Sequence, residues 1–336
     1  MRPKVYIGKL LSDKKSYLPI LYPNLGRQHK DSRLFLDRAY DCLTSPVVDI
    51  VENVSEADFL LIPYDFFNIS ERQSYIREFE TLAKKANKKI IIFDFSDYTE
   101  PIDVSNALVF RVSQKRGEKR SNVIVMPPFV EDLKVAMPRA YRDKPLVSFM
   151  GYAGHNSLKS KMAYLLRTLF AGGGDKPGIY YRRRAIEILS KAEGIDTNFK
   201  ILKTYSGHSD TILGDPEVVR ANYIKSIVES DFVLAPRGNG NYSIRFFEAL
   251  ALGRIPILID VDQELPMEDL INYEKFIIRV DYKDMNNLST IVTAKWQSLN
   301  SESYANMQKE ARLNFEQHLR MDKFLFLAFG KLVGRN

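Results

Sequence analysis

The stretch that decides the fold spans residues 230–260 and reads SDFVLAPRGNGNYSIRFFEALALGRIPILID. Its apolar run at 232–235 predicts a buried strand, which Pro236 ends because proline has no N–H for a strand ladder. Apolar residues at helical spacing from Ile244 to Leu252 predict a helix, and Gly253 ends that helix. A second apolar run follows the helix. The stretch therefore predicts a strand, a glycine-rich turn, a helix and another strand.

The glycine-rich turn predicts an anion-binding site. Gly238 and Gly240 allow backbone angles that are closed to other residues and a close approach of the main chain to a ligand. Asn241 or Ser243 suits the N-cap of the following helix. Free N–H groups and the helix dipole favour an anion at the carboxyl end of such a strand. Together with Asn239, these residues are our candidates for holding the phosphates of a ligand.

Charged side chains surround the turn. Arg237 and Arg245 flank it, and Glu248 lies one turn into the helix. We interpret the turn as a cradle for the diphosphate of a nucleotide, whose ribose hydroxyls donate to Glu248. The alternative is an ordinary tight turn with a solvated ion pair between Arg245 and Glu248. The spacing matches neither a P-loop nor the Gly-x-Gly-x-x-Gly fingerprint, which disfavours both of those nucleotide sites.

Composition is that of a globular protein. The 336 residues are 45% hydrophobic and 27% charged, which suits two domains of ordinary size. No apolar run reaches the length of a membrane span, and the first residues resemble a strand rather than a signal peptide. The single cysteine, Cys42, excludes an intrachain disulfide and fits a reducing compartment. We expect a cytoplasmic protein.

The chain is basic, with a net charge of +7 and a pI near 9.1. Two clusters, at 115–120 and 181–184, contain most of the locally concentrated basic residues. Neither belongs to a recognisable nucleic-acid module, so nucleic acid is not an expected partner. We interpret the clusters as solvated surface. The alternative is peripheral contact with anionic lipids or with a charged, lipid-linked acceptor.

Apolar runs and helical patterns alternate along the chain, which predicts parallel strands joined by helical crossovers. The proline- and charge-rich segment 136–145 predicts a linker between two such halves. We expect an N-terminal domain at 1–140, a C-terminal domain at 146–320, and a final helix at 321–336 that crosses back to the first domain. The tail is predicted to be helical from Leu288 to Leu332. Other helices are expected at 32–43, 70–86, 158–169, 181–192 and 216–229, and other strands at 4–8, 59–63, 89–93, 107–111, 123–126, 146–150, 199–204 and 276–280.

The central stretch resembles the signature of the exostosin family, glycosyltransferase family 47. The likeness rests on PRGNGNYSIRFFEAL at 236–250 and on Gly-x-Ile-Pro at 253–256. Patches at 55–63 and at Phe149-Met150-Gly151 are also similar to the family, so the resemblance extends over about residues 55–280. Lys161 stands where relatives often carry arginine. The resemblance implies an α/β fold of two Rossmann-like domains facing each other across a cleft, the GT-B architecture.

The family implies transfer of a sugar from a nucleotide-sugar donor to a glycan acceptor. We expect a UDP-linked donor, inversion at the transferred sugar, and an acceptor that is a bacterial surface polysaccharide or a viral glycan. One Asp-x-Asp triplet, Asp260-Val261-Asp262, follows the helix of the decisive stretch. Arg237 and Arg245 are expected to replace the metal that other transferases use. The prediction is therefore of no cofactor and no metal site. Two alternatives remain: a GT-B transferase of different stereochemistry, and a catalytically silent nucleotide- or glycan-binding partner subunit.

An inverting transferase needs a general base, which we expect from the N-terminal domain. Asp94 and Asp97 follow one predicted strand and Asp65 follows another, where ligands gather in open α/β sheets. Each of these aspartates also suits a turn or an N-cap. On the donor side, Gly151 and His155 follow the strand that opens the second domain. The sequence names neither the sugar, the linkage nor the oligomeric state.

Overall fold

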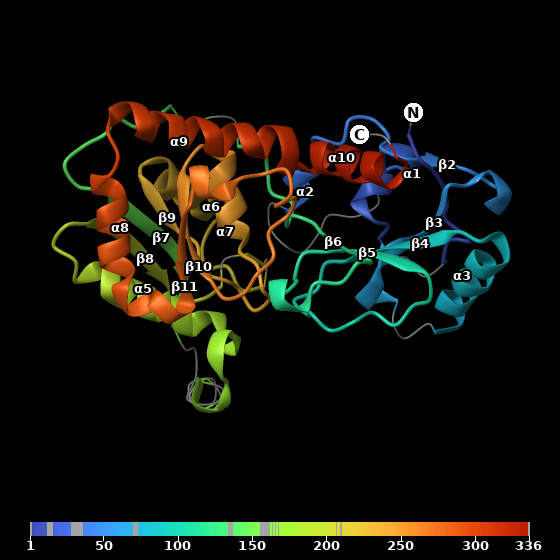
Figure 1. The fold of residues 1–336 in the computed structure, drawn as a ribbon, viewed down its shortest axis with the longest axis horizontal. Coiled ribbons are helices and arrows are strands. Elements are labelled where there is room, and N and C mark those ends of the chain that lie inside the picture. Colours follow the sequence, from blue (N-terminus) through green and yellow to red (C-terminus); the bar gives the residue numbers. More distant parts are fainter. Residues whose placement is uncertain are drawn as a thin grey trace.

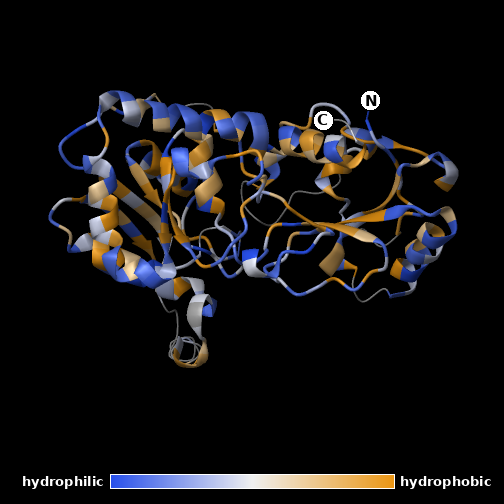
Figure 2. Cartoon of the chain, in the orientation of Figure 1, coloured by the Kyte–Doolittle hydropathy of each residue, from blue (hydrophilic) through white to orange (hydrophobic). Residues whose placement is uncertain are grey.

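The protein is described by a computed structural model, which covers residues 2–11, 16–27, 36–69, 73–133, 137–154, 162, 164, 166, 168–205, 207–208 and 210–334. Two parallel sheets form the centres of two domains that lie side by side (Figure 1). Strands of both sheets are mostly hydrophobic, whereas α9 (Ser301–Asn314) is largely hydrophilic on the surface seen in Figure 2. The predicted α/β fold with two Rossmann-like units is confirmed.

The N-terminal sheet has the strand order β2-β1-β3-β4-β5-β6. Its strands are nearly fully buried in the middle of the sheet, which explains their continuous apolar runs. The helix α3 (Gln73–Ala86) packs Ile76 and Phe79 against this sheet. The strands are β1 (Lys4–Tyr6), β2 (Asp49–Ile50), β3 (Phe59–Asp65), β4 (Lys89–Asp94), β5 (Ala107–Arg111) and β6 (Val123–Val125).

The C-terminal sheet has the order β11-β10-β9-β7-β8, so β9, the first predicted element of the decisive stretch, lies at its centre. The predicted strand, turn, helix and strand are all present there. The strands are β7 (Leu146–Tyr152), β8 (Asp196–Leu202), β9 (Phe232–Leu234), β10 (Ile255–Asp260) and β11 (Ile278–Asp281). The helices of this half are α5 (Gly178–Ser190), α6 (Pro216–Val228), α7 (Ile244–Ala251) and α8 (Leu288–Gln297).

The predicted helical tail from Leu288 to Leu332 is present, and it is divided into the helices α8, α9 and α10 (Met321–Leu332). The helix α8 ends at Gln297. Asn300 then forms a capping box with Ser303, and this capping box starts α9. A π-helical turn, Phe315–Leu319, then separates α9 from α10. Only α2 (Leu36–Ala39) is described within the helix expected at 32–43, and most of the helix expected at 158–169 lies outside the described residues.

The helix α10 packs on the first domain, whereas α9 lies over the second (Figure 1). Phe324 and Phe329 are buried in one cluster with Val5 and Phe110, and the rings of Phe110 and Phe329 stack at a centroid distance of 5.5 Å. The apolar run at 324–329 therefore belongs to the core of the N-terminal domain. Within the described part of the chain, no helix has the length and apolar character that crossing a membrane requires.

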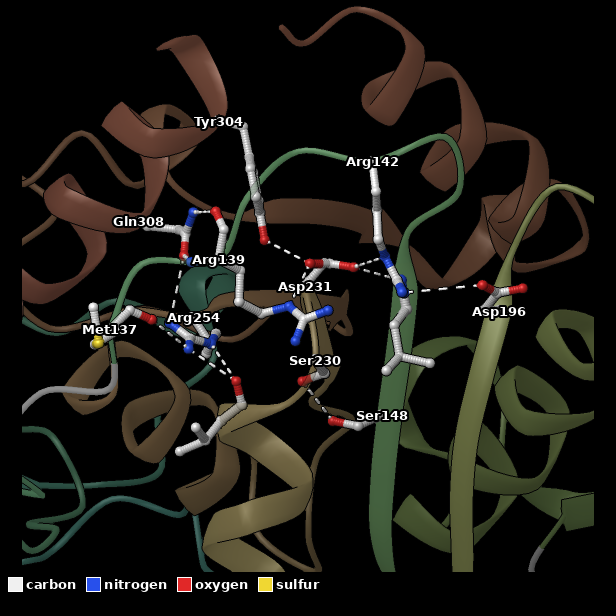
Figure 3. Close-up of polar contacts among 12 residues, drawn as sticks. Met137, Arg139, Arg142, Ser148, Asp196, Ser230, Asp231, Arg254, Tyr304 and Gln308 are labelled. Carbon is white, nitrogen blue, oxygen red and sulfur yellow. Dashed lines mark hydrogen bonds and ion pairs between the residues drawn. The ribbon is translucent and has the colours of Figure 1, made fainter. Parts of the chain in front are cut away.

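A buried carboxylate joins the linker to the C-terminal domain (Figure 3). Asp231 has no exposed surface and lies just before β9. It accepts hydrogen bonds from Arg139 Nε at 2.7 Å and Arg142 Nε at 3.1 Å. The Leu146 N–H and the Tyr304 hydroxyl donate to it at 2.7 and 2.8 Å. One side chain thus ties together the linker, β7, β9 and α9.

We predict that Asp231→Ala destabilises the protein by about 3–5 kcal/mol, because it leaves partly buried guanidinium groups without their anion. Urea unfolding followed by circular dichroism measures the change. Asp143→Ala is the matched control, since Asp143 is an exposed aspartate in the same linker. Equal unfolding midpoints for the two variants would show that Asp231 does not organise the linker.

Candidate active site

The glycine-rich turn leads from β9 to α7 and has almost no free space around it. A Cβ on Gly240 would lie 2.6 Å from Asp97 Oδ1, and a Cβ on Gly178 would lie 2.0 Å from the Gly238 carbonyl oxygen. Neither Gly238 nor Gly240 has a positive φ, whereas Gly253 does, at 61°. Gly240 is therefore required for close approach, whereas a Cβ on Gly238 would meet nothing nearer than Tyr242 O at 3.8 Å. The unusual backbone angles expected at these two glycines are absent.

The N-terminal domain holds the turn in place. The Asn241 N–H donates to Ser113 Oγ at 2.9 Å, and Asn241 Nδ2 donates to the Gln114 carbonyl at 3.2 Å. Ser113 Oγ in turn donates to the Asp97 carbonyl at 3.2 Å. Ser243 occupies the N-cap position of α7, but its side chain makes no capping hydrogen bond. Asn241 thus serves as a link between domains rather than as a cap.

Three arginines from three elements meet beside the turn and donate to carbonyl oxygens. Arg245 Nη2 donates to Met150 O at 2.9 Å. Arg182 on α5 donates to Tyr152 O at 3.1 Å and to Arg237 O at 3.4 Å. Arg237 Nη2 donates to the carbonyl of Asn239, its neighbour in the turn, at 2.7 Å. We call Arg182, Arg237 and Arg245 the arginine cluster.

The arginine cluster has no counter-ion among the described residues. None of its members forms an ion pair with a described carboxylate, and each Nε is buried without a hydrogen-bond partner. Burial, together with repulsion from Arg245, lowers the pKa of Arg182 to about 10. Burial also lowers the pKa of Arg237. Uncompensated buried cations are costly, so the cluster has the electrostatic character of an anion site.

The Phe149-Met150-Gly151 element forms the floor of the arginine cluster. The Arg245 guanidinium lies 4.3 Å from the centroid of the Phe149 ring, in a cation–π contact. A Cβ on Gly151 would lie 2.7 Å from Arg245 Nη2, so a larger residue would displace the end of this side chain. The structure therefore brings together two segments that the sequence analysis singled out separately. His155, the other candidate on this loop, lies outside the described residues.

The carboxylate of Glu248 accepts hydrogen bonds from side chains that the sequence analysis did not identify as its partners. Its side chain is 8% exposed, and its Oε1 accepts from Arg220 Nη1 at 2.5 Å, while the Tyr223 hydroxyl donates to Oε2. No ion pair with Arg245 is formed. Arg220 also pairs with Glu131 at 3.2 Å, and its pKa is raised by these carboxylates. Glu248 thus anchors α6 to α7 and does not form the solvated pair with Arg245.

The three candidate bases lie in different environments. Asp94 has no exposed surface and pairs with buried Arg111 at 2.6 Å. Its burial removes it from the candidates, because a base must reach the acceptor hydroxyl. Asp65 accepts from the Phe95 N–H at 3.0 Å, as a residue that shapes a turn does. Asp97 is exposed and lies against Gly240, so it is the aspartate that the structure brings to the glycine-rich turn.

The sequence analysis missed Arg182, which it assigned to a solvated cluster. A signal was present, because the buried residues of α5 are Gly178, Tyr181, Ala185 and Leu189. Arg182 follows Gly178 by four residues and precedes Ala185 by three, which places it on their face of the helix. Arg183, one residue further, is exposed. The Arg220–Glu248 pair was also missed, since nothing in the local pattern connects α6 to α7.

Comparisons with known proteins identify relatives of this chain. A rice protein named "Probable glucuronosyltransferase" is 25% identical over 239 residues, which cover 70% of this chain and 44% of that protein. Zebrafish Exostosin-1a is 23% identical over 255 residues, covering 73% and 34% of the two chains. An Arabidopsis protein named "Probable beta-1,4-xylosyltransferase" is 31% identical over 137 residues, covering 40% and 29%. The chain thus spans less than half the length of these relatives.

Two solved structures are similar to this chain at low sequence identity. TarM from S. aureus has a TM-score of 0.41 at 10% identity, with 81% of this chain and 55% of that chain covered. The pneumococcal O-GlcNAc transferase GtfA has a TM-score of 0.39 at 10% identity, with coverages of 84% and 57%.

The Exostosin GT47 domain model matches residues 106–295, which is more than half of the sequence. The chain therefore belongs to the exostosin GT47 family.

Proposed function

We propose that the protein is an inverting, metal-independent glycosyltransferase that uses a UDP-linked sugar and a glycan acceptor. The arginine cluster carries the proposal, because three half-buried arginines without a described counter-ion suit the diphosphate that leaves during transfer. Family membership and relatives named for glucuronosyl and xylosyl transfer support the same reaction class.

Charge development at the leaving group is the step that the arginines would assist. As the bond between the anomeric carbon and the diphosphate breaks, negative charge grows on the phosphate oxygens. Arg182, Arg237 and Arg245 are held by main-chain carbonyls, so they need little reorganisation to stabilise that charge. Their burial strengthens the interaction, because the local dielectric is low.

Asp97 is the base that we assign to the acceptor side. Its carboxylate would take the proton from the acceptor hydroxyl as the acceptor oxygen attacks the anomeric carbon. The buried Asp94–Arg111 pair positions it, because Arg111 donates to the carbonyls of Tyr98, Thr99 and Glu100 and so fixes the loop that carries Asp97. Asp94 is thus a positioning residue for the base.

An aromatic pair beside Asp97 suits the sugar ring of an acceptor. Phe67 and Tyr98 follow β3 and β4, are 40% and 57% exposed, and lie at a ring-centroid distance of 5.1 Å. Both rings present apolar faces next to the proposed base, as in saccharide sites lined by aromatic side chains. We include this pair in the proposed acceptor site.

The anomeric configuration of the product distinguishes inversion from the alternative stereochemistry.

We predict that Arg182→Ala weakens UDP binding by about tenfold to a hundredfold, because one charge-assisted hydrogen bond contributes about 1.5–3 kcal/mol. Titration calorimetry with UDP measures the effect. Arg183→Ala is the matched control, since the neighbouring side chain on α5 is exposed. If both variants bind UDP as the wild type does, the arginine cluster does not hold the diphosphate.

Asp97→Asn should lower the rate of transfer by about 10²–10⁴-fold, because it removes general-base catalysis. The affinity for UDP should stay within twofold of the wild type. Single-turnover transfer to a glycan acceptor is the measurement, and Asp103→Asn, an exposed aspartate further along the same domain, is the control. A fully active Asp97→Asn variant would exclude this residue as the base.

Transfer should persist after the protein is treated with EDTA. The reason is that guanidinium groups can supply the electrostatic stabilisation that a divalent ion gives elsewhere. The assay compares initial rates before and after chelation, with and without added manganese. A complete loss of activity that manganese restores would contradict metal independence while leaving the glycosyltransferase assignment intact.

A further inference from the structure

A second site lies behind the arginine cluster. A cavity of about 270 Å³ opens between the start of α5 and η7 (Tyr282–Asn287), the 3-10 segment after β11. The loop that carries Gly174 separates it from the cluster: Arg237 Nη1 donates to Gly174 O at 3.4 Å, and a Cβ on Gly174 would lie 3.5 Å from the Tyr282 ring. Tyr181, 1% exposed, lines the cavity and interacts with Arg237.

The cavity is positively charged. Lys176, Arg184 and Lys283 line it, and no carboxylate does. Lys176 and Lys283 form no ion pair with a described residue. The acidic groups nearby are engaged or point to solvent: Glu187 pairs with Arg184 at 3.2 Å, Asp281 accepts from the Lys283 N–H at 2.8 Å, Asp175 pairs with Lys115 at 2.9 Å, and Asp284 is exposed.

Tyrosine rings form the rest of the wall. Lys176 Nζ lies 4.3 Å from the centroid of the Tyr180 ring, and Lys283 Nζ lies 5.7 Å from that of Tyr282. Arg184 is held by Asn286, whose Oδ1 accepts from Nη2 at 3.0 Å. The cavity thus combines apolar ring faces and phenol hydroxyls with cationic groups, which are the two kinds of contact that a charged sugar needs.

The volume limits the occupant. Sites for drug-sized ligands usually measure about 300–1,000 Å³, so this cavity suits a single sugar unit rather than a whole nucleotide. We propose that the cavity between α5 and η7 binds one acidic sugar unit of the glycan substrate, with its carboxylate or phosphate on Lys176 and Lys283 and its ring on Tyr282. The identification of that sugar with a substrate rests on the proposed function, whereas the binding site itself does not.

Titration of the wild-type protein with D-glucuronate, D-glucose and inorganic phosphate, followed by NMR chemical shifts, tests the proposal. Glucuronate is expected to bind at least tenfold more tightly than either glucose or phosphate, because only glucuronate supplies both the charge and the ring. The double variant Lys176→Ala/Lys283→Ala should lose at least tenfold in glucuronate affinity. Tyr282→Ala should lose glucuronate binding and keep the weak binding of phosphate.

Lys275→Ala is the control for surface charge, since Lys275 is exposed and lies outside the cavity. Equal affinities for glucuronate and glucose, equal affinities for glucuronate and phosphate, or a double variant that binds like the wild type would each overturn the proposal. The double variant should bind UDP unchanged and melt at the wild-type temperature. The proposed function fails by a different result, namely UDP binding that Arg182→Ala does not weaken.

Discussion

The carboxylate of Asp231 is the constraint on which the C-terminal half depends. It is buried at the start of β9 and is satisfied by two guanidinium groups, a hydroxyl and a main-chain N–H. A buried anion needs such partners, so the linker, β7 and α9 must converge on this point. At the other end of the same short strand, the chain enters the glycine-rich turn and Arg237. The strand therefore carries a satisfied negative charge at one end and unsatisfied positive charge at the other.

Residues of both domains form the candidate site and are hydrogen-bonded to each other there. Ser113 and Gln114, from the first domain, hold the Asn241 that begins the path into α7. Arg116 of the same loop pairs with Asp260 at the end of β10, which also pairs with Arg279. Because the Ser113 hydroxyl also bonds to the main chain at Asp97, the proposed base and the glycine-rich turn are connected by two hydrogen bonds. The geometry of the site thus depends on the domains staying in register.

Local patterns were sufficient to predict the decisive stretch, β5 and the break near residues 136–145, because each depends on residues that are neighbours in sequence. They were insufficient wherever a partner lies far away. Arg182 is one of three consecutive arginines. Helical spacing places it on the face of Gly178 and Ala185, but the sequence does not show that this face meets the turn. Asp94 and Asp97 look alike in sequence. Asp94 forms an ion pair with the buried Arg111, whereas Asp97 lies at the surface. Glu248 lies one turn into α7 as predicted, but its partners Arg220 and Tyr223 come from α6, which the local pattern does not indicate.

The position of α10 has a consequence for how the protein is made. The core of the N-terminal domain contains Phe324, Leu325 and Phe329, which are separated from its strands by the whole second sheet. A ribosome therefore releases every strand of the first domain long before the helix that covers them. The last residues of the second domain's core are Trp296, Tyr304 and Met307. All of them are synthesised before α10, so this core can form earlier. The domain synthesised first is thus the one completed last, and its apolar face must stay uncovered during the interval.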